Sequence, residues 1–289
     1  MRIGVKVNNV GPDGHLVVHH ARIAEEVGFD SLWLSDRVIN PEHIESHYPF
    51  TADGSAPWTA DTAWYESIVS LSLVAAATER IEVATGVLVA PLRDPVVVGR
   101  QMATLDVLTG GRTVLGIGVG WMREEFEGIG IPWARRGART EEWLRVVRAV
   151  WHGDPEGWEG EHYAIPADAR FYPTPARSIP VVFGGNSSRA VERSGALADG
   201  WFGLLRLDEL NLDWVAWAVQ TMRTGGREAR RDPGDLRAIL RVQGDRSAVA
   251  EVAPELAAAG VDELVVDGEF EDPDGLARSL DRLRAASAA

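Results

Sequence analysis

A glycine pair followed by small polar residues stands at one expected junction between a strand and a helix. An apolar run beginning at residue 181 is followed by Gly184, Gly185, Asn186 and Ser187, and then by a segment with helical periodicity. The first amide groups of a helix have no carbonyl partner within the helix, and the helix dipole is positive there, so the junction suits a phosphate group. Asn and Ser are also common helix caps, so a cap without a ligand is the alternative.

Two further glycine patterns occur where other strands are expected to end. Gly116, Gly118 and Gly120 alternate with apolar residues, and Gly86 lies inside a β-branched run. A glycine in a strand removes packing and permits close approach of a ligand or of another backbone segment. The alternating glycines fit either a flat ligand against the backbone or a tight turn. Gly86 fits either a backbone irregularity or close packing of a helix.

Few other residues are candidates for catalysis or metal binding. Asp36 follows a strand-like run and is the best-placed carboxylate, with an ion pair to a neighbouring charge as the alternative. His43 and His47 are four residues apart but lack the H-E-x-x-H pattern, so no metal site is expected. The chain has no cysteine and no G-x-S-x-G motif, and Lys6 is its only lysine and so its only candidate for a Schiff base.

The chain alternates between two kinds of segment. These segments would position the residues named above. Apolar β-branched runs are expected strands near 2–7, 30–35, 81–89, 113–118, 180–184, 200–205, 236–242 and 262–267. Segments of helical period follow each run, near 15–27, 63–78, 95–108, 137–151, 187–197, 208–224, 247–259 and 273–286. Eight such pairs predict an α/β fold, a (β/α)8 TIM barrel, as a single domain of residues 1–289. An open doubly wound sheet is the alternative, but no G-x-G-x-x-G follows the first strand.

Three connections are longer than usual for this fold. They are residues 37–62 after the second strand, 119–136 after the fourth and 152–179 before the fifth. The first two follow the carboxyl ends of strands, where a TIM barrel has its active site. The third contains enough β-forming residues at 161–165 for a small hairpin.

Composition narrows the classes of function. The formal net charge of −14 repels nucleic acid, so no nucleic-acid partner is expected. No run of about 18 apolar residues occurs, so no membrane span is expected. The apolar start of the chain is too short for a signal peptide, so we expect a cytoplasmic protein.

Several segments together resemble one known family. They are GFDSLWLSDR (28–37), HYPFTADGSAPW (47–58), TERIEVATGVLVAPLRDPVVVGRQMATLDVLTGGRTVLGIGVGW (78–121), RGARTEEWLRVVRAVW (136–151) and FGGNSSRAVERSGALADGW (183–201). In order and spacing, from about residue 1 to 205, the chain resembles the luciferase-like monooxygenase superfamily. It is most similar to the actinobacterial branch of coenzyme F420-dependent oxidoreductases. Beyond residue 205 the resemblance is limited to the barrel pattern.

The resemblance implies a barrel that binds the deazaflavin F420, or FMN in sister branches, at the carboxyl ends of its strands. It implies a cis peptide bond between Gly86 and Val87, whose bulge supports the ring. The cofactor-binding residues that it implies are Asp36 at the edge or the side chain of the ring, Gly86, Val87, Val119 and Gly120 beside the ring, Gly184, Gly185, Asn186, Ser187 and Arg189 at the phosphate, and Asp199 and Gly200 closing the pocket.

The resemblance also implies hydride transfer between deazaflavin C5 and a small organic substrate, with Asp36, Arg37 and His47 as the expected catalytic residues. Arg37 replaces the usual histidine of the family; an arginine grips a carboxylate or carbonyl oxygen but does not donate a proton near neutral pH. Trp121 replaces the glutamate of sugar-phosphate-oxidising relatives, so that substrate class is not predicted. A proton donor is expected from the insertion at 37–62, with His43, His47 and Tyr48 as the candidates and loop packing as the alternative.

Charge and surface suggest how the partners would bind. Arg135, Arg136 and Arg139 follow the fourth strand and would offset the repulsion between this acidic protein and the anionic F420 tail, with surface ion pairs as the alternative. The expected partners are a small organic substrate and a second copy of the chain, through apolar residues of the second and third helices. An FMN-dependent luciferase-like monooxygenase and a non-catalytic cofactor-binding barrel are the alternative functions.

Overall fold

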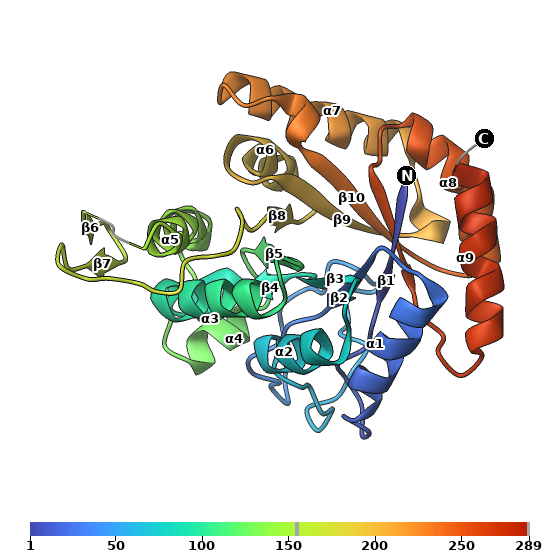
Figure 1. The fold of residues 1–289 in the computed structure, drawn as a ribbon, viewed down its shortest axis with the longest axis horizontal. Helices are drawn as coiled ribbons and strands as arrows, with labels where there is room; N and C mark the ends of the chain where they lie inside the picture. The colour runs from blue at the N-terminus through green and yellow to red at the C-terminus, as the bar shows by residue number, and fades with distance from the viewer. Residues whose placement is uncertain (154–155, 288–289) are drawn as a thin grey trace.

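The computed structural model describes residues 1–153 and 156–287 and shows a closed parallel β-barrel. Its strands are β1 (Arg2–Lys6), β2 (Ser31–Leu34), β3 (Glu82–Thr85), β5 (Thr113–Gly118), β8 (Val181–Gly184), β9 (Gly200–Arg206), β10 (Arg237–Gln243) and β11 (Glu263–Asp267). They pair in the order β3-β2-β1-β11-β10-β9-β8-β5, and the pairing of β3 with β5 closes the ring (Figure 1). The predicted TIM barrel and its eight strands are confirmed.

Helices follow the strands and cover the outside of the barrel. They are α1 (Leu16–Val27), α2 (Ser67–Ala77), α3 (Pro95–Leu108), α5 (Arg136–Trp151), α6 (Ser188–Leu197), α7 (Leu212–Glu228), α8 (Arg246–Ala258) and α9 (Pro273–Ser287). The helix expected near 208–224 begins later than predicted, at Leu212, because the Asn211 side chain caps it by accepting a hydrogen bond from the Trp214 amide.

Short elements complete the described fold. They are β4 (Leu88–Val89), α4 (Arg123–Gly128), β6 (Trp158–Glu159), β7 (Ala164–Ile165) and the 3-10 turns η1 (Ala90–Leu92), η2 (Leu207–Glu209) and η3 (Pro233–Asp235). β6 and β7 pair in antiparallel fashion, so the small hairpin before β8 is confirmed, although its first strand precedes the expected 161–165. The sequence did not predict α4, which occupies the insertion after β5.

Two apolar regions hold the barrel together. The larger lies between the strands and the helices and includes Val5 of β1, Leu71 of α2 and Trp143 of α5. The smaller fills the barrel interior with Trp33, Ala84, Val114, Val182, Phe202, Ile239 and Val265. Because side chains alternate along a strand, the residue two positions after each interior residue also faces inward, one layer nearer the carboxyl end.

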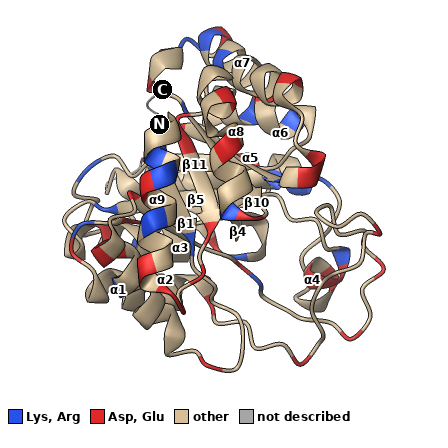
Figure 2. Cartoon of the chain, turned by 90° about the vertical axis from the view of Figure 1, so that its right-hand side faces the viewer, with Lys and Arg blue, Asp and Glu red and all other residues tan. Residues whose placement is uncertain are grey.

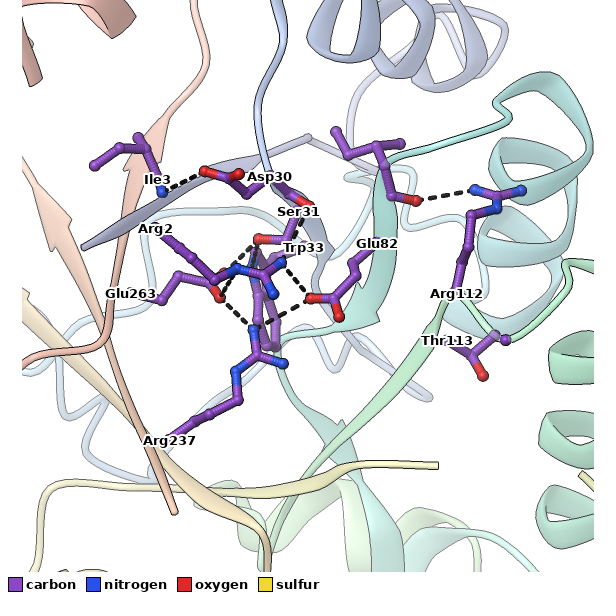
Figure 3. Close-up of polar contacts among 12 residues, drawn as sticks. Arg2, Ile3, Asp30, Ser31, Trp33, Glu82, Arg112, Thr113, Arg237 and Glu263 are labelled. Atoms are coloured by element: carbon purple, nitrogen blue, oxygen red, sulfur yellow. Dashed lines mark hydrogen bonds and ion pairs between the residues drawn. The ribbon is translucent and has the colours of Figure 1, made fainter. Parts of the chain in front are cut away.

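Two arginines and two glutamates close the amino end of the barrel interior (Figure 3). Glu263 is completely buried; it accepts hydrogen bonds from Arg237 and from the Trp33 indole nitrogen, the latter at 3.1 Å, and its Oε2 lies 3.4 Å from Arg2 Nε. Glu82 accepts hydrogen bonds from both arginines. Two positive and two negative charges balance at this end.

The loops that follow the strands gather at the end of the barrel opposite this network. In Figure 2 the N-terminus, which leads into β1, lies far from α4, which follows β5. The same view shows acidic and basic residues side by side on α9. Within residues 1–153 and 156–287, none of the helices has the length and apolar character needed to cross a lipid bilayer.

Replacing Glu263 by alanine is expected to lower the free energy of unfolding by about 3–5 kcal/mol, because Arg2 and Arg237 lose a completely buried partner. Urea unfolding followed by circular dichroism measures the change. Glu269→Ala is the matched control, because the Glu269 side chain is 77% exposed in its pair with Arg246 and should contribute less than about 1 kcal/mol. Similar losses in the two variants would contradict this role of the network.

Candidate functional site

The carboxyl end of β3 contains a bulge. β3 pairs with β5 at Ala84, and β4 resumes the pairing at Leu88, four residues later, whereas the two partner positions on β5 are three residues apart. One extra residue is therefore accommodated between them, which defines a β-bulge. The peptide bond between Gly86 and Val87, within this bulge, is cis, as the resemblance implied.

Glycines on the neighbouring strands make room for the bulge. A Cβ atom on Gly184 would lie 2.8 Å from both methyl groups of Val87, and one on Gly118 would lie 2.9 Å from one of them. A Cβ on Gly116 would lie 2.0 Å from the Thr85 carbonyl oxygen. In a close-packed interior these positions admit no larger residue. The alternating glycines therefore first accommodate the chain's own backbone and Val87.

The Asp36 carboxylate connects the end of β2 to the segment after the bulge. It forms a two-point ion pair with Arg93, at 2.7 and 2.6 Å, and accepts hydrogen bonds from the Ser67 hydroxyl and, at 2.8 Å, from the Val89 amide. Its side chain is completely buried. These donors give Asp36 a positioning role, while its expected catalytic role stays a prediction.

Arg37 lies in an aromatic enclosure built by the two insertions. Its guanidinium carbon is 4.7 Å from the centre of the Trp58 ring and 5.3 Å from the centres of the Trp64 and Trp121 rings. It also donates to Glu125 of α4 at 2.9 Å, and both side chains are buried. Cation–π contacts and the carboxylate together compensate its charge. Arg37 thus joins the insertion after β2 to α4.

Glu125 also holds the first residues of that insertion. Its second oxygen accepts hydrogen bonds from the Val38 amide at 2.8 Å and from the Ile39 amide at 3.3 Å. Burial raises the pKa of Glu125, and the Arg37 charge and the two amides partly oppose this rise. The Arg37–Glu125 pair is therefore internal, and the expected catalytic role of Arg37 stays a prediction.

Tyr48 belongs to the same aromatic group. Its ring packs edge-on against Trp58 and Trp121, with ring centres 5.1 and 5.0 Å apart. Burial raises the pKa of Tyr48, while the charges of Arg241 on β10 and of Arg37 partly lower it. The phenol is therefore partly buried and lies within electrostatic reach of both arginines.

His47, next to Tyr48 in the chain, is exposed. A Cβ on Gly54 would lie 2.0 Å from its Nδ1 atom, so the imidazole packs directly on this glycine. In the part of the chain that the structure describes, His47 forms no hydrogen bond or ion pair with Asp36 or Arg37. The catalytic role expected for His47 stays a prediction.

The start of α6 is open to solvent. Ser187 caps the helix, and Asn186 exchanges two hydrogen bonds with the Leu204 backbone of β9, at 2.5 and 3.2 Å. Gly185 has a φ of 130°, a conformation that favours glycine. Ser187 and Arg189 are exposed. Because the first amides of a helix lack partners within it, this end can bind an anionic group.

Two of the arginines after β5 have different surroundings. Arg136 begins α5, lies 3.6 Å from the centre of the Trp133 ring and donates to the Gly120 carbonyl at 3.2 Å. Burial lowers the pKa of Arg136. Arg135 instead pairs with exposed Glu161, which is the surface ion pair weighed as the alternative. Arg136 therefore brings a positive charge beside the end of β5.

Asp199 and Gly200 lie at the wrong end of the barrel for the role that the resemblance implied. The Asp199 amide donates to the carbonyl of Val181, the first residue of β8, and its carboxylate pairs with Arg231 at 2.5 Å. Gly200 is the first residue of β9. Residues that precede or begin a parallel barrel strand lie at its amino end, so the expectation that these two close the phosphate pocket was wrong.

Sequence reasoning missed two partners in the site. Arg93 pairs with Asp36 at a separation of 57 residues, and Glu125 pairs with Arg37 at a separation of 88 residues. No local pattern indicates a contact over such a distance in the chain. Lys6 did carry a visible signal, because it is a lone lysine within an apolar strand.

A comparison with known families identifies the class of protein. Residues 1–244 match the family described as luciferase-like monooxygenase. The chain therefore belongs to this family of oxidoreductases, for which flavin-type cofactors, FMN or F420, are typical. Among residues 1–153 and 156–287, no group of three or more His, Cys, Asp or Glu side chains is arranged to hold a metal ion.

Individual relatives share about a third of their aligned residues with this chain. An uncharacterized protein of Mycobacterium tuberculosis is 32% identical over 250 residues, which cover 86% of this chain and 77% of that one. An F420-dependent glucose-6-phosphate dehydrogenase of Amycolatopsis mediterranei is 30% identical over 207 residues, 70% of this chain and 56% of that enzyme.

Solved structures establish the shared fold. An F420-dependent secondary alcohol dehydrogenase in complex with an F420–acetone adduct superimposes with a TM-score of 0.80 at 16% identity, covering 99% of this chain and 98% of that one. The oxygenating constituent of 3,6-diketocamphane monooxygenase from Pseudomonas putida, in complex with FMN, gives 0.74 at 16% identity, covering 100% and 98%. The barrel is thus common to proteins with either cofactor.

Gly184→Ala is expected to lower the free energy of unfolding by about 1–3 kcal/mol, because the added methyl group overlaps Val87. Val87→Ala in the same chain removes the opposing methyl groups and should restore most of the loss. Urea unfolding of the wild type, both single variants and the double variant gives the coupling free energy. Losses that add within about 0.5 kcal/mol would show that the two residues are not in contact.

Proposed function

We propose that this chain is a coenzyme F420-dependent oxidoreductase that acts on a small organic substrate, with residues 1–289 as a single luciferase-like barrel domain. The observation that carries the proposal is the Val87 bulge, which presents an apolar surface two strands away from the open start of α6. Relatives of about 30% identity that are named F420-dependent favour the deazaflavin over FMN.

In this proposal the residues divide into three groups. The ring lies against Gly86 and Val87, with Val119 and Gly120 beside it. Gly184 lacks a side chain and so leaves room for Val87. The phosphate binds at Gly185, Asn186 and Ser187, with Arg189 nearby. When bound, the deazaflavin supplies hydride transfer at its C5 carbon.

The surrounding side chains orient the reactants. Asp36 fixes the backbone after the bulge through its bond to the Val89 amide. The Arg37–Glu125 pair keeps the aromatic insertion in place, which excludes water from the reacting atoms. Tyr48 is the proton donor that we favour over His47, because the Tyr48 phenol is half-buried against Trp58 and Trp121, whereas His47 is exposed.

Ser187→Asp tests the phosphate site without disturbing the helix. Aspartate is as good a helix cap as serine, so the fold should be retained, but its carboxylate would repel a phosphate at the same position. The expected result is a dissociation constant for F420 at least tenfold higher than that of the wild type, measured by fluorescence titration. Ala285→Asp, which adds a carboxylate on the exposed face of α9, is the control and should leave the affinity unchanged.

Titration of the wild type with FMN completes the test. Tight binding of FMN without binding of F420 would contradict the proposal in favour of a monooxygenase. Binding of F420 without turnover across ketones, enones and alcohols would instead indicate a non-catalytic cofactor-binding barrel.

We also propose that two copies of the chain associate through α2 and α3, which lie side by side in Figure 1. Their outer faces carry apolar side chains with high exposed fractions, namely Val69 (61%), Leu73 (57%), Val97 (54%) and Leu108 (78%). A groove of about 450 Å³ runs between the two helices. Exposed apolar patches of this kind favour a symmetric protein–protein contact.

Leu73→Asp is expected to convert the dimer to a monomer, because a carboxylate would be buried in the contact. Light scattering coupled to size-exclusion chromatography measures the mass. Trp217→Asp is the control, because Trp217 is a 41% exposed residue of α7, away from the proposed contact. A wild-type mass near 31.4 kDa, the mass of one chain, would contradict the dimer.

A further inference from the structure

The inward-facing layer at the carboxyl end of the barrel has two unlike halves. One layer beyond the apolar interior, β3, β5 and β8 contribute the glycines that surround the bulge. In the same layer β1, β10 and β11 contribute Lys6, Arg241 and Asp267, which we call the charged half. A ring that rests on the bulge would have this charged half on its other side.

Contacts within the charged half are few. Lys6 is only 4% exposed, and its amine donates to the Val7 carbonyl at 2.5 Å. Among the described residues no carboxylate lies within ion-pair distance of that amine. Arg241 donates to one oxygen of Asp267 through two nitrogen atoms, at 3.0 and 2.6 Å. The Asp267 side chain is 40% exposed, so this half reaches solvent.

The charges in this half are not balanced as they are at the amino end. There, two arginines face two glutamates, whereas here the single carboxylate of Asp267 pairs with Arg241 and, among the described residues, leaves the Lys6 amine without an ion-pair partner. Burial and the Arg241 charge lower the pKa of Lys6 well below its usual value, and Asp267 opposes this only in part. An anion between the amine and the guanidinium would favour the charged form of Lys6 and complete the balance.

The charged half is separate from the proposed phosphate site. In the ring of eight strands β1, which carries Lys6, lies directly opposite β8, which leads into α6, and β10, which carries Arg241, is separated from β8 by β9. Tyr48 in the insertion after β2 packs against Trp58 and Trp121, the rings that enclose Arg37, and the charges of Arg241 and Arg37 both lower its pKa against the rise caused by burial.

We propose that Lys6 and Arg241 bind a carboxylate of the substrate, so that the substrate is an organic acid with a reducible carbonyl or an oxidisable hydroxyl group elsewhere in the molecule. This inference rests on the proposed hydride transfer and specifies its substrate class. Arg241, oriented by Asp267, and Lys6 supply charge-assisted hydrogen bonds to the carboxylate oxygens.

The experiment compares 4-oxopentanoate with hexan-2-one, a ketone of similar shape without the charge. Their dissociation constants are measured by ligand-observed NMR on the purified full chain, with and without F420. We expect the wild type to bind 4-oxopentanoate at least about tenfold more tightly, as charge-assisted hydrogen bonds predict. Lys6→Met and Arg241→Met should each remove this preference.

Arg206→Met is the matched control. Arg206 ends β9 and already pairs with Asp208 on the surface, so its loss should leave the preference intact. Lys6→Met should keep or raise the melting temperature measured by circular dichroism, because it replaces a desolvated amine by an apolar side chain of similar length. Equal binding of the two ketones by the wild type, or a preference that survives both substitutions, would overturn the inference.

Titration of the same variants with F420 separates this inference from the proposed function. Unchanged F420 affinity together with lost carboxylate binding supports a substrate subsite at Lys6 and Arg241. Loss of F420 affinity in both variants would assign the two residues to the cofactor and overturn the inference. A wild type that binds 4-oxopentanoate in the expected way but does not bind F420 would contradict the proposed function alone.

Discussion

The position of Val87 inside the barrel is the constraint on which the carboxyl end depends. Its side chain occupies space that residues of β5 and β8 would otherwise fill, so Gly118 and Gly184 must lack a side chain. Asp36 then fixes the segment that follows the bulge by accepting a hydrogen bond from the Val89 amide. The ends of four strands are thereby held as one unit. The half-buried Val87 side chain is thereby held in place at the end where a TIM barrel carries its function.

Buried charge is handled differently at the two ends of the barrel. At the amino end, every buried charge has an opposite partner, as Glu263 shows with Arg2 and Arg237. The pairs at the carboxyl end that hold the insertion are likewise complete. The Lys6 amine is the exception, because the Asp267 carboxylate beside it pairs with Arg241; Lys6 lies on β1, across the barrel from β8, and Arg241 lies on β10, two strands from β8. Unbalanced charge at a solvent-reaching end suits recognition better than stability, because an unpaired buried charge is costly.

Much of the fold could be predicted from local patterns. Parallel strands are buried on both faces, so their sequences are continuous apolar runs, and amphipathic helices between them show a period of 3.6 residues. The start of α7 was predicted too early because residues 208–209 form a separate turn before the Asn211 cap. Resemblance supplied the cis bond at Gly86, and the residue types Asn and Ser supplied the cap at the start of α6; periodicity alone indicates neither.

By itself the sequence determined the order of strands and helices, the barrel that follows from it, and the glycines and capping residues at the strand ends. Tertiary structure alone decided the partners of the charged residues, which bring Arg93 to Asp36 and Glu125 to Arg37. It also located Asp199 at the amino end. The physical reason is that periodicity reflects burial of each residue's own segment, whereas an ion pair depends on which distant segments the closed barrel brings within a few ångströms.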